Sequence, residues 1–110
     1  MIFDKEGNTT IVLQEKRDLK TFLRNLNEAY PKIENDHLIV NLFSLGPLTT
    51  EDVVEFLELS NRHRGKGKSF VLVSDGISYE QVPDEIALAP SLQEARDIIE
   101  MEEIERDLDL

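Results

Sequence analysis

Two adjacent threonines, Thr49 and Thr50, are the residues of this sequence best placed to carry regulatory chemistry. They follow a Gly-Pro turn and open a Thr-Thr-Glu-Asp segment that favours a helix start. A phosphate on such a hydroxyl would meet free backbone N–H groups and the positive end of the helix dipole. Glu51 and Asp52 would repel the phosphate, although they suit the first turn of an unmodified helix. Two interpretations therefore stay open: a phosphorylation site at Thr50 or Thr49, or a helix cap and nothing more.

The other residue types that usually carry chemistry are sparse or badly spaced. The sequence has no cysteine, and its two histidines, His37 and His63, belong to no metal-binding spacing. We interpret them as ordinary surface or strand-end histidines. No Ser/His/Asp arrangement stands out, and the abundant carboxylates favour a solvated acidic face. The sequence therefore predicts no catalytic residue, no metal and no cofactor, and a protein that is not an enzyme.

The segment GKGKS, residues 65–69, is similar to the end of a phosphate-binding loop. The earlier glycine of that motif would fall at position 62, which is Arg62. The segment also leads from a predicted helix into a predicted strand, whereas the motif needs the opposite order. We interpret its basic residues as compensation for the negative end of a helix dipole.

The charge of the chain limits its partners. The 110 residues carry a net charge of −11, and residues 80–110 alone hold eleven acidic residues against two arginines. Such a chain repels nucleic acid and anionic membrane, so we expect neither as a partner. A basic protein surface is favoured instead.

The length and the termini indicate where the protein works. A chain of 110 residues predicts a single domain over 1–110. The N-terminus does not have the pattern of a signal peptide, and the apolar runs are too short to span a membrane. With no cysteine, these features are compatible with a cytoplasmic protein.

Hydrophobic periodicity predicts a βαβ core. Residues 2–4 and 9–13 favour a hairpin, and residues 17–30 favour a helix that Pro31 ends. Residues 37–43 and 69–74 have the near-continuous apolar pattern of buried strands, with one helix from 49 or 50 to about 62 between them. Such an order predicts parallel neighbours.

The rest of the chain completes an α/β fold. Residues 77–82 favour one helical turn, residues 85–89 a short edge strand, and residues 92–107 a helix introduced by a Ser-x-x-Glu capping box. The predicted order is β-β-α-β-α-β-(β)-α, with a mixed sheet of four or five strands and helices packed mainly on one face. The expected core residues are Leu13, Phe22, Leu26, Ile39, Val40, Leu42, Val53, Leu57, Phe70, Leu72, Leu92, Ala95 and Ile98.

Two long segments carry a resemblance to a known family. The run DHLIVNLFSLGPLTTEDVVEFLELSNRHRGKGKSFVLVS and the later APSLQEARDII resemble the STAS domain of bacterial anti-sigma-factor antagonists, over nearly the whole chain. In that family, the loop after the first buried strand leads into a helix that begins Asp-Ser-Ser-Gly. Those four positions fall on Thr49, Thr50, Glu51 and Asp52, so a hydroxyl survives at the phosphorylated position while the rest of the motif is degenerate.

The resemblance implies a regulatory, non-enzymatic module that binds a kinase or anti-sigma type of partner. Phosphorylation of the first serine of the motif releases that partner in the family, which makes Thr50 the candidate site here. The docking loop would comprise Ser44, Leu45, Gly46, Pro47, Leu48, Thr49, Thr50 and Glu51. Two alternatives remain: a structural or assembly component acting through the acidic C-terminal helix, or a small enzyme of unknown type. The sequence does not predict an oligomeric state.

Overall fold

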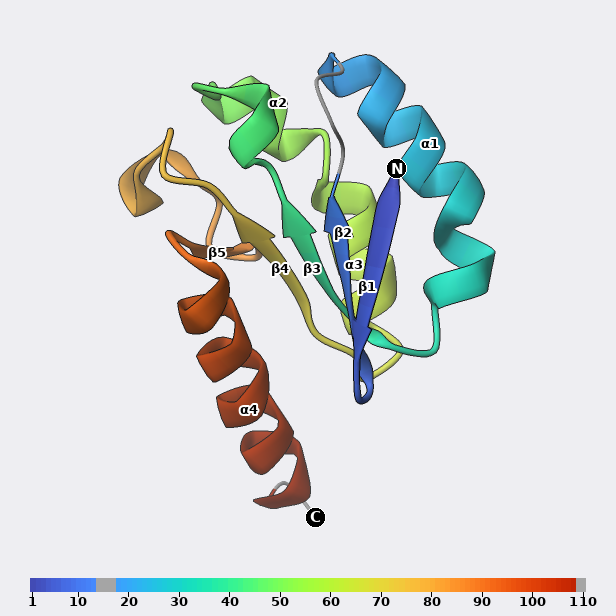
Figure 1. The fold of residues 1–110 in the computed structure, drawn as a ribbon. Coiled ribbons are helices and arrows are strands. Elements are labelled where there is room, and N and C mark those ends of the chain that lie inside the picture. The colour runs from blue at the N-terminus through green and yellow to red at the C-terminus, as the bar shows by residue number, and fades with distance from the viewer. Residues whose placement is uncertain (14–17, 109–110) are drawn as a thin grey trace.

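A single mixed sheet forms the centre of the computed structural model, which describes residues 1–13 and 18–108. In those ranges five strands pair in the order β1-β2-β3-β4-β5 (Figure 1). Strand β1 runs antiparallel to β2, while β2, β3, β4 and β5 are mutually parallel. The strands are β1 Ile2–Glu6, β2 Thr9–Leu13, β3 His37–Asn41, β4 Phe70–Val73 and β5 Ala87–Ala89. The predicted hairpin, parallel core and edge strand are confirmed.

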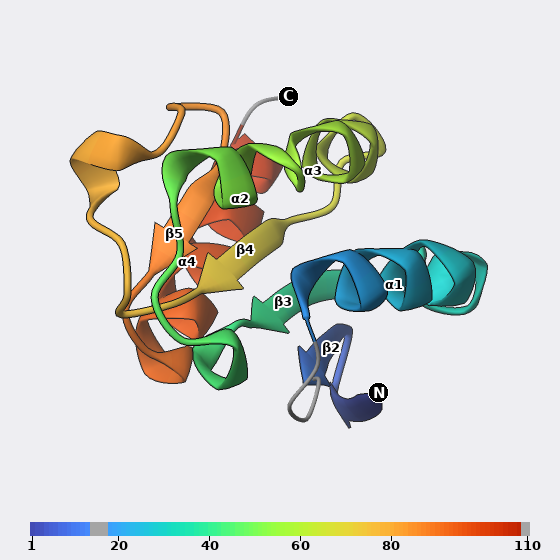
Figure 2. The ribbon, with the colours of Figure 1, turned by 90° about the horizontal axis from the view of Figure 1, so that it is seen from above.

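Helices connect the parallel strands and cover both faces of the sheet. They are α1 Leu19–Ile33, α2 Thr50–Val54, α3 Leu57–Arg64 and α4 Leu92–Leu108, with 3-10 turns η1 Phe43–Leu45 and η2 Tyr79–Gln81. Seen from above, α1, α2 and α3 lie on one side of the sheet and the start of α4 lies on the other (Figure 2). The predicted α/β class, with helices mainly on one face, is confirmed.

The alternating side chains of the strands supply two apolar layers. Val12, Val40 and Leu72 belong to the layer that packs under α1, α2 and α3. Their neighbours Ile39 and Val71 belong to the layer under α4. Most of the expected core is fully buried, but four members of it are only partly buried: Leu13, Leu57, Leu92 and Ile98.

Helix α1 does not end where the sequence predicts. Asp18 caps it by accepting a hydrogen bond from the backbone N–H of Thr21 at 2.7 Å. The predicted start at Arg17 lies outside the described residues. At the other end the helix continues through Pro31 to Ile33, so the prediction that proline ends it was wrong. A proline in the last turn removes only one donor, and the buried side chain of Ile33 holds that turn against the core.

The single predicted second helix is divided into α2 and α3. Val53, Phe56 and Leu59 are all buried, at a spacing of three residues rather than 3.6. The chain meets this spacing with a tight turn in which the N–H of Phe56 donates to the carbonyl of Val53 at 3.0 Å. The turn places the Phe56 ring in edge contact with Phe22, 6.1 Å between centroids. The predicted single helix is thus interrupted at Glu55 and Phe56.

His63 is fully buried, which contradicts its interpretation as a surface residue. Its Nε2 lies 2.8 Å from the carbonyl of Asp36, which can only accept, so Nε2 carries the proton. Nδ1 then accepts from the hydroxyl of Tyr30 at 2.7 Å. Burial of the ring lowers the pKa of His63. The neutral imidazole thus joins the ends of α1 and α3 to the turn before β3.

A second polar cluster fixes α4 at the amino ends of the parallel strands. Glu102 accepts from the Ser69 hydroxyl at 2.6 Å and from both terminal nitrogens of Arg64, at 3.0 and 3.4 Å. The Ser69 hydroxyl also accepts from Arg106 at 3.1 Å. Beside it, the buried strand-end His37 accepts from the Ser69 N–H at 2.9 Å, and burial lowers the pKa of its ring. These contacts decide which side of α4 faces the sheet.

No helix in the described ranges is long and apolar enough to cross a membrane.

The two buried histidines predict a fold that loses stability as the pH falls below about 6.5. Each has a folded pKa below that of the unfolded chain, about 6.5, so the unfolded state binds more protons as the pH falls through that range. The urea-unfolding free energy should therefore be lower at pH 5.5 than at pH 7.5. The variant His63→Gln should be less stable at pH 7.5 and should show a weaker pH dependence. Equal pH dependence in the variant and the parent would contradict this account of His63. Asp36, whose pKa is lowered chiefly by the Thr10 hydroxyl, would titrate only at lower pH.

Candidate functional site

The loop between β3 and α2 leaves the sheet at its carboxyl edge, where parallel strands commonly present functional loops. Strand β3 ends at Asn41, two residues earlier than predicted, because the Asn41 side chain accepts from the N–H of Phe43 at 3.0 Å and starts a turn. Gly46 has φ 71°, a conformation that glycine adopts without strain. Leu48 is buried and anchors the far end of the loop in the core. The loop is therefore held at both ends.

Thr49 is the N-cap of α2, and its hydroxyl is occupied. That oxygen accepts from the N–H of Asp52 at 3.1 Å, and the Asp52 carboxylate accepts from the N–H of Thr49 at 2.9 Å. The reciprocal pair is a capping box. Thr49, and not Thr50, is thus the helix cap.

Thr50 has a different environment. It is the first residue of α2, its side chain is exposed, and its hydroxyl makes no hydrogen bond to any residue that the structure describes. Glu51 follows it and is also exposed. Of the two candidate hydroxyls, that of Thr50 is therefore the one left free of the capping box.

A second loop supports the first. After β4, the Ser74 hydroxyl accepts from the N–H of Gly76 at 3.1 Å. A Cβ on Gly76 would lie only 3.0 Å from the Cα of Pro47 and 3.2 Å from the carbonyl oxygen of Gly46. The backbones of the two loops therefore pack directly against each other, and only glycine fits between them.

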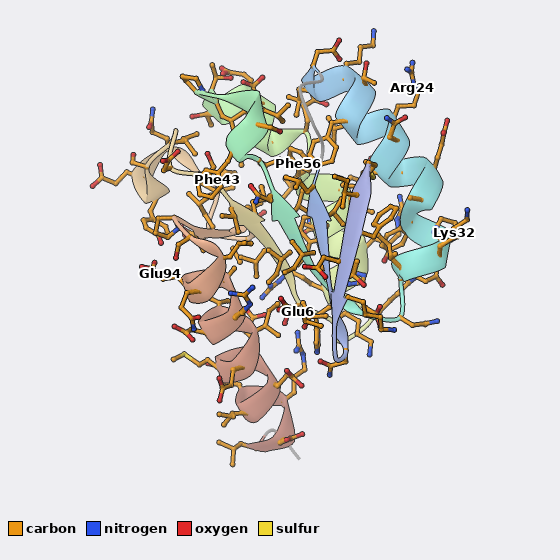
Figure 3. All side chains as sticks on the ribbon, viewed as in Figure 1. Glu6, Arg24, Lys32, Phe43, Phe56 and Glu94 are labelled. Atoms are coloured by element: carbon orange, nitrogen blue, oxygen red, sulfur yellow. The ribbon has the colours of Figure 1, made fainter. Side chains whose placement is uncertain are left out.

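The rim of the carboxyl edge carries apolar side chains in an acidic setting. Phe43 in η1 and Val54 in α2 are each 41% exposed, and Tyr79 in η2 is 60% exposed. Figure 3 shows Phe43 beside the loop, at the end of the sheet away from the hairpin turn. The segments 38–61 and 69–95, which run through this edge, contain nine acidic residues and no lysine or arginine. We call Phe43, Val54 and Tyr79, with the loop Ser44–Glu51, the rim surface.

A groove of about 390 Å³ adjoins the rim surface between α1 and α2. Its lining combines two leucines, three carboxylates and one lysine: Leu19, Leu23, Glu51, Asp52, Glu55 and Lys20. Such a lining suits a long cationic side chain, whose apolar stem would contact leucines while its charged head meets a carboxylate.

The structure brings the predicted docking loop together with residues that the sequence analysis missed. Phe43 was assigned to the end of a buried strand and Val54 to the second predicted helix, and neither was expected in the docking loop. The absence of basic residues from 38–61 was visible in the sequence and would have indicated one acidic edge. Among the residues described, no group of three or more His, Cys, Asp or Glu side chains is arranged to hold a metal ion.

Comparison with known proteins identifies the fold. No protein-family model and no curated protein matches the sequence. Among solved structures, a serine-to-glutamate variant of RsbS from Moorella thermoacetica aligns with a TM-score of 0.65 at 19% identity, over 91% of this chain and 94% of that chain. A structure of the stressosome, described as a signal integration and transduction hub, aligns with a TM-score of 0.60 at 19% identity, over 91% and 96% of the two chains. Both are STAS-domain proteins, so the predicted STAS fold is confirmed.

The capping box predicts that the two threonines contribute unequally to stability. Thr49→Ala should lower the free energy of unfolding by about 1 kcal/mol, because the Asp52 N–H loses its acceptor. Thr49→Ser should retain most of that stability, and Thr50→Ala should change it by less than about 0.5 kcal/mol. Urea denaturation of the three variants tests this. A larger loss from Thr50→Ala than from Thr49→Ala would show that Thr50 is the cap.

Proposed function

We propose that residues 1–110 form a single, non-enzymatic, cytoplasmic module that regulates another protein by binding it through the rim surface. The observation that carries the proposal is the exposure of Phe43 and Val54 beside the loop at the carboxyl edge. The STAS fold shared with RsbS and the stressosome supports a regulatory role based on protein contacts.

The charge around the rim surface specifies the partner. The segments 38–61 and 69–95, which carry the exposed apolar side chains, hold nine acidic residues and offer no basic residue to an acidic partner. The partner would place lysine or arginine around an apolar contact, with one such side chain in the groove between α1 and α2. A kinase or anti-sigma type of protein with a basic docking face meets this requirement, in agreement with the resemblance to anti-sigma-factor antagonists.

Thr50 is the proposed point of regulation. Its hydroxyl is exposed within the rim surface, while the hydroxyl of Thr49 is engaged in the capping box. The partner's basic residues would attract a phosphate on Thr50, but its bulk in the middle of the contact and the desolvation of its charge, about −2, would oppose docking. Glu51 and Asp52 already place negative charge next to it, which would limit the electrostatic change.

The rim surface predicts which substitutions weaken binding. In titrations of labelled protein with purified kinase or anti-sigma candidates, Phe43→Ser should weaken binding to its partner at least about tenfold, because apolar anchors dominate such contacts. Thr50→Glu should also weaken it, and higher salt should reduce affinity. Phe3→Ser, at a position 44% exposed on β1, is the matched control and should bind like the parent. If Phe43→Ser, Thr50→Ala and Thr50→Glu all bind like the parent, the rim surface is not the docking site.

The free hydroxyl predicts the site of modification. Mass spectrometry of the protein isolated from its own cells should find phosphate on Thr50 and none on Thr49. Phosphate found on Thr49 would contradict a switch at Thr50. So would a protein that carries no phosphate under conditions in which its partner is released.

A further inference from the structure

Helix α4 is apolar on two opposite sides. Ala95 and Ile99 are buried against the sheet, and Glu102 and Arg106 continue that side into the polar cluster around Ser69. A second set, Met101, Ile104 and Leu108, is 62%, 54% and 79% exposed. One helix thus carries a covered side and an uncovered apolar stripe.

The spacing of the exposed stripe is that of a coiled-coil seam. Met101, Ile104 and Leu108 lie three and then four residues apart, which are the a, d and a positions of a heptad. In this register Ala95, Ile99 and Arg106 fall on the b and f positions, and the structure places them toward the protein body. Figure 1 shows α4 running along the sheet and then beyond its hairpin end, which leaves the last turns accessible.

The residues that border the stripe are acidic throughout. Glu100 and Asp107 occupy g positions and Glu105 occupies the e position, and all three are exposed. The two arginines of α4 are engaged elsewhere, since Arg96 pairs with Glu6 at 2.9 Å and Arg106 donates to Ser69. No basic residue therefore belongs to this border.

We propose that the stripe Met101–Ile104–Leu108 is a second docking site, and that its occupant is a partner helix with apolar a and d positions and lysine or arginine at e and g. Charges at e and g choose the partner in coiled coils. A second copy of this chain would set carboxylates against carboxylates, which disfavours self-pairing. A basic amphipathic helix buries the stripe and neutralises its border. The site lies on the other face of the sheet from α2 and is independent of the rim surface.

The two methionines of the chain allow a direct test. Met101 lies in the stripe, whereas Met1 packs against the opposite core layer. With ¹³C-labelled methionine methyl groups, a synthetic peptide of about three heptads with Leu at a and d and Lys at e and g should shift the Met101 signal and leave the Met1 signal in place. The same peptide with Glu at e and g should shift neither, and oligolysine of equal charge should bind at least about tenfold more weakly.

Variants separate the stripe from general acidity. Ile104→Glu should weaken peptide binding about tenfold or more, while Tyr79→Ser, at a position of similar exposure on the rim surface, should bind the peptide like the parent. The triple variant Glu100→Lys, Glu105→Lys, Asp107→Lys should reverse the peptide preference: it should bind the peptide with Glu at e and g and no longer the peptide with Lys there. Since all five positions of these variants are exposed, circular dichroism should show an unchanged fold.

Three results would overturn the proposal. The first is a Met101 signal that stays in place at saturating peptide. The second is equal binding of oligolysine and the heptad peptide. The third is a Met101 signal that depends on protein concentration in the absence of peptide, since that would show a second copy covering the stripe. None of these depends on whether the rim surface binds a kinase.

Discussion

The structure depends on the need to bury both sides of β3 and β4. Residues 37–40 and 70–73 are all buried, so each strand must be covered above and below. Three helices cover one side and α4 covers the other, as parallel strands with crossover helices require. The same parallel order gathers the loops after β3 and β4 at one edge, where the Gly76 contact joins them. The rim surface therefore follows from the way the core is covered.

The opposite edge holds the polar contacts that orient the covering helices. His63 joins α1, α3 and the turn before β3 by two hydrogen bonds, and Glu102 joins α4 to Ser69 and Arg64. Buried polar groups of this kind are costly when unpaired, so they favour one arrangement of the helices over others. Because Glu102 and Arg106 face the sheet, Ile104 and Leu108, each two residues further along the helix, face outward. The polar contacts at the amino edge of the sheet thus determine that the stripe Met101–Ile104–Leu108 is exposed on the far side of α4.

The hydrophobic pattern was sufficient to predict most of the fold, because the near-continuous apolar runs of the buried strands differ from the 3.6-residue period of the amphipathic helices. It failed where a single tertiary contact decided the outcome. The break before Leu57 depends on fitting Phe56 beside Phe22, which lies more than thirty positions earlier. The burial of His63 depends on Tyr30, equally distant in sequence, while its basic neighbours suggested a solvated helix end.

The candidate site was predicted to a similar extent. The loop and the helix start follow from local turn and capping preferences, so its position was expected from the sequence. From the sequence, either Thr49 or Thr50 could be the helix cap. The structure decides between them because the Asp52 carboxylate accepts from the N–H of Thr49. The outward stripe of α4 was hidden for another reason: its apolar residues and those facing the sheet form one continuous series in the sequence, and only burial divides them.

The central claim is that a protein partner binds at the carboxyl edge of the sheet. Hydrogen–deuterium exchange of the chain, alone and bound to the partner isolated from its own cells, tests it most directly. The account predicts slower exchange on binding in residues 43–55 and in the adjoining loop 75–82. Slower exchange confined to β1 and the hairpin turn, with residues 43–55 unchanged, would contradict it.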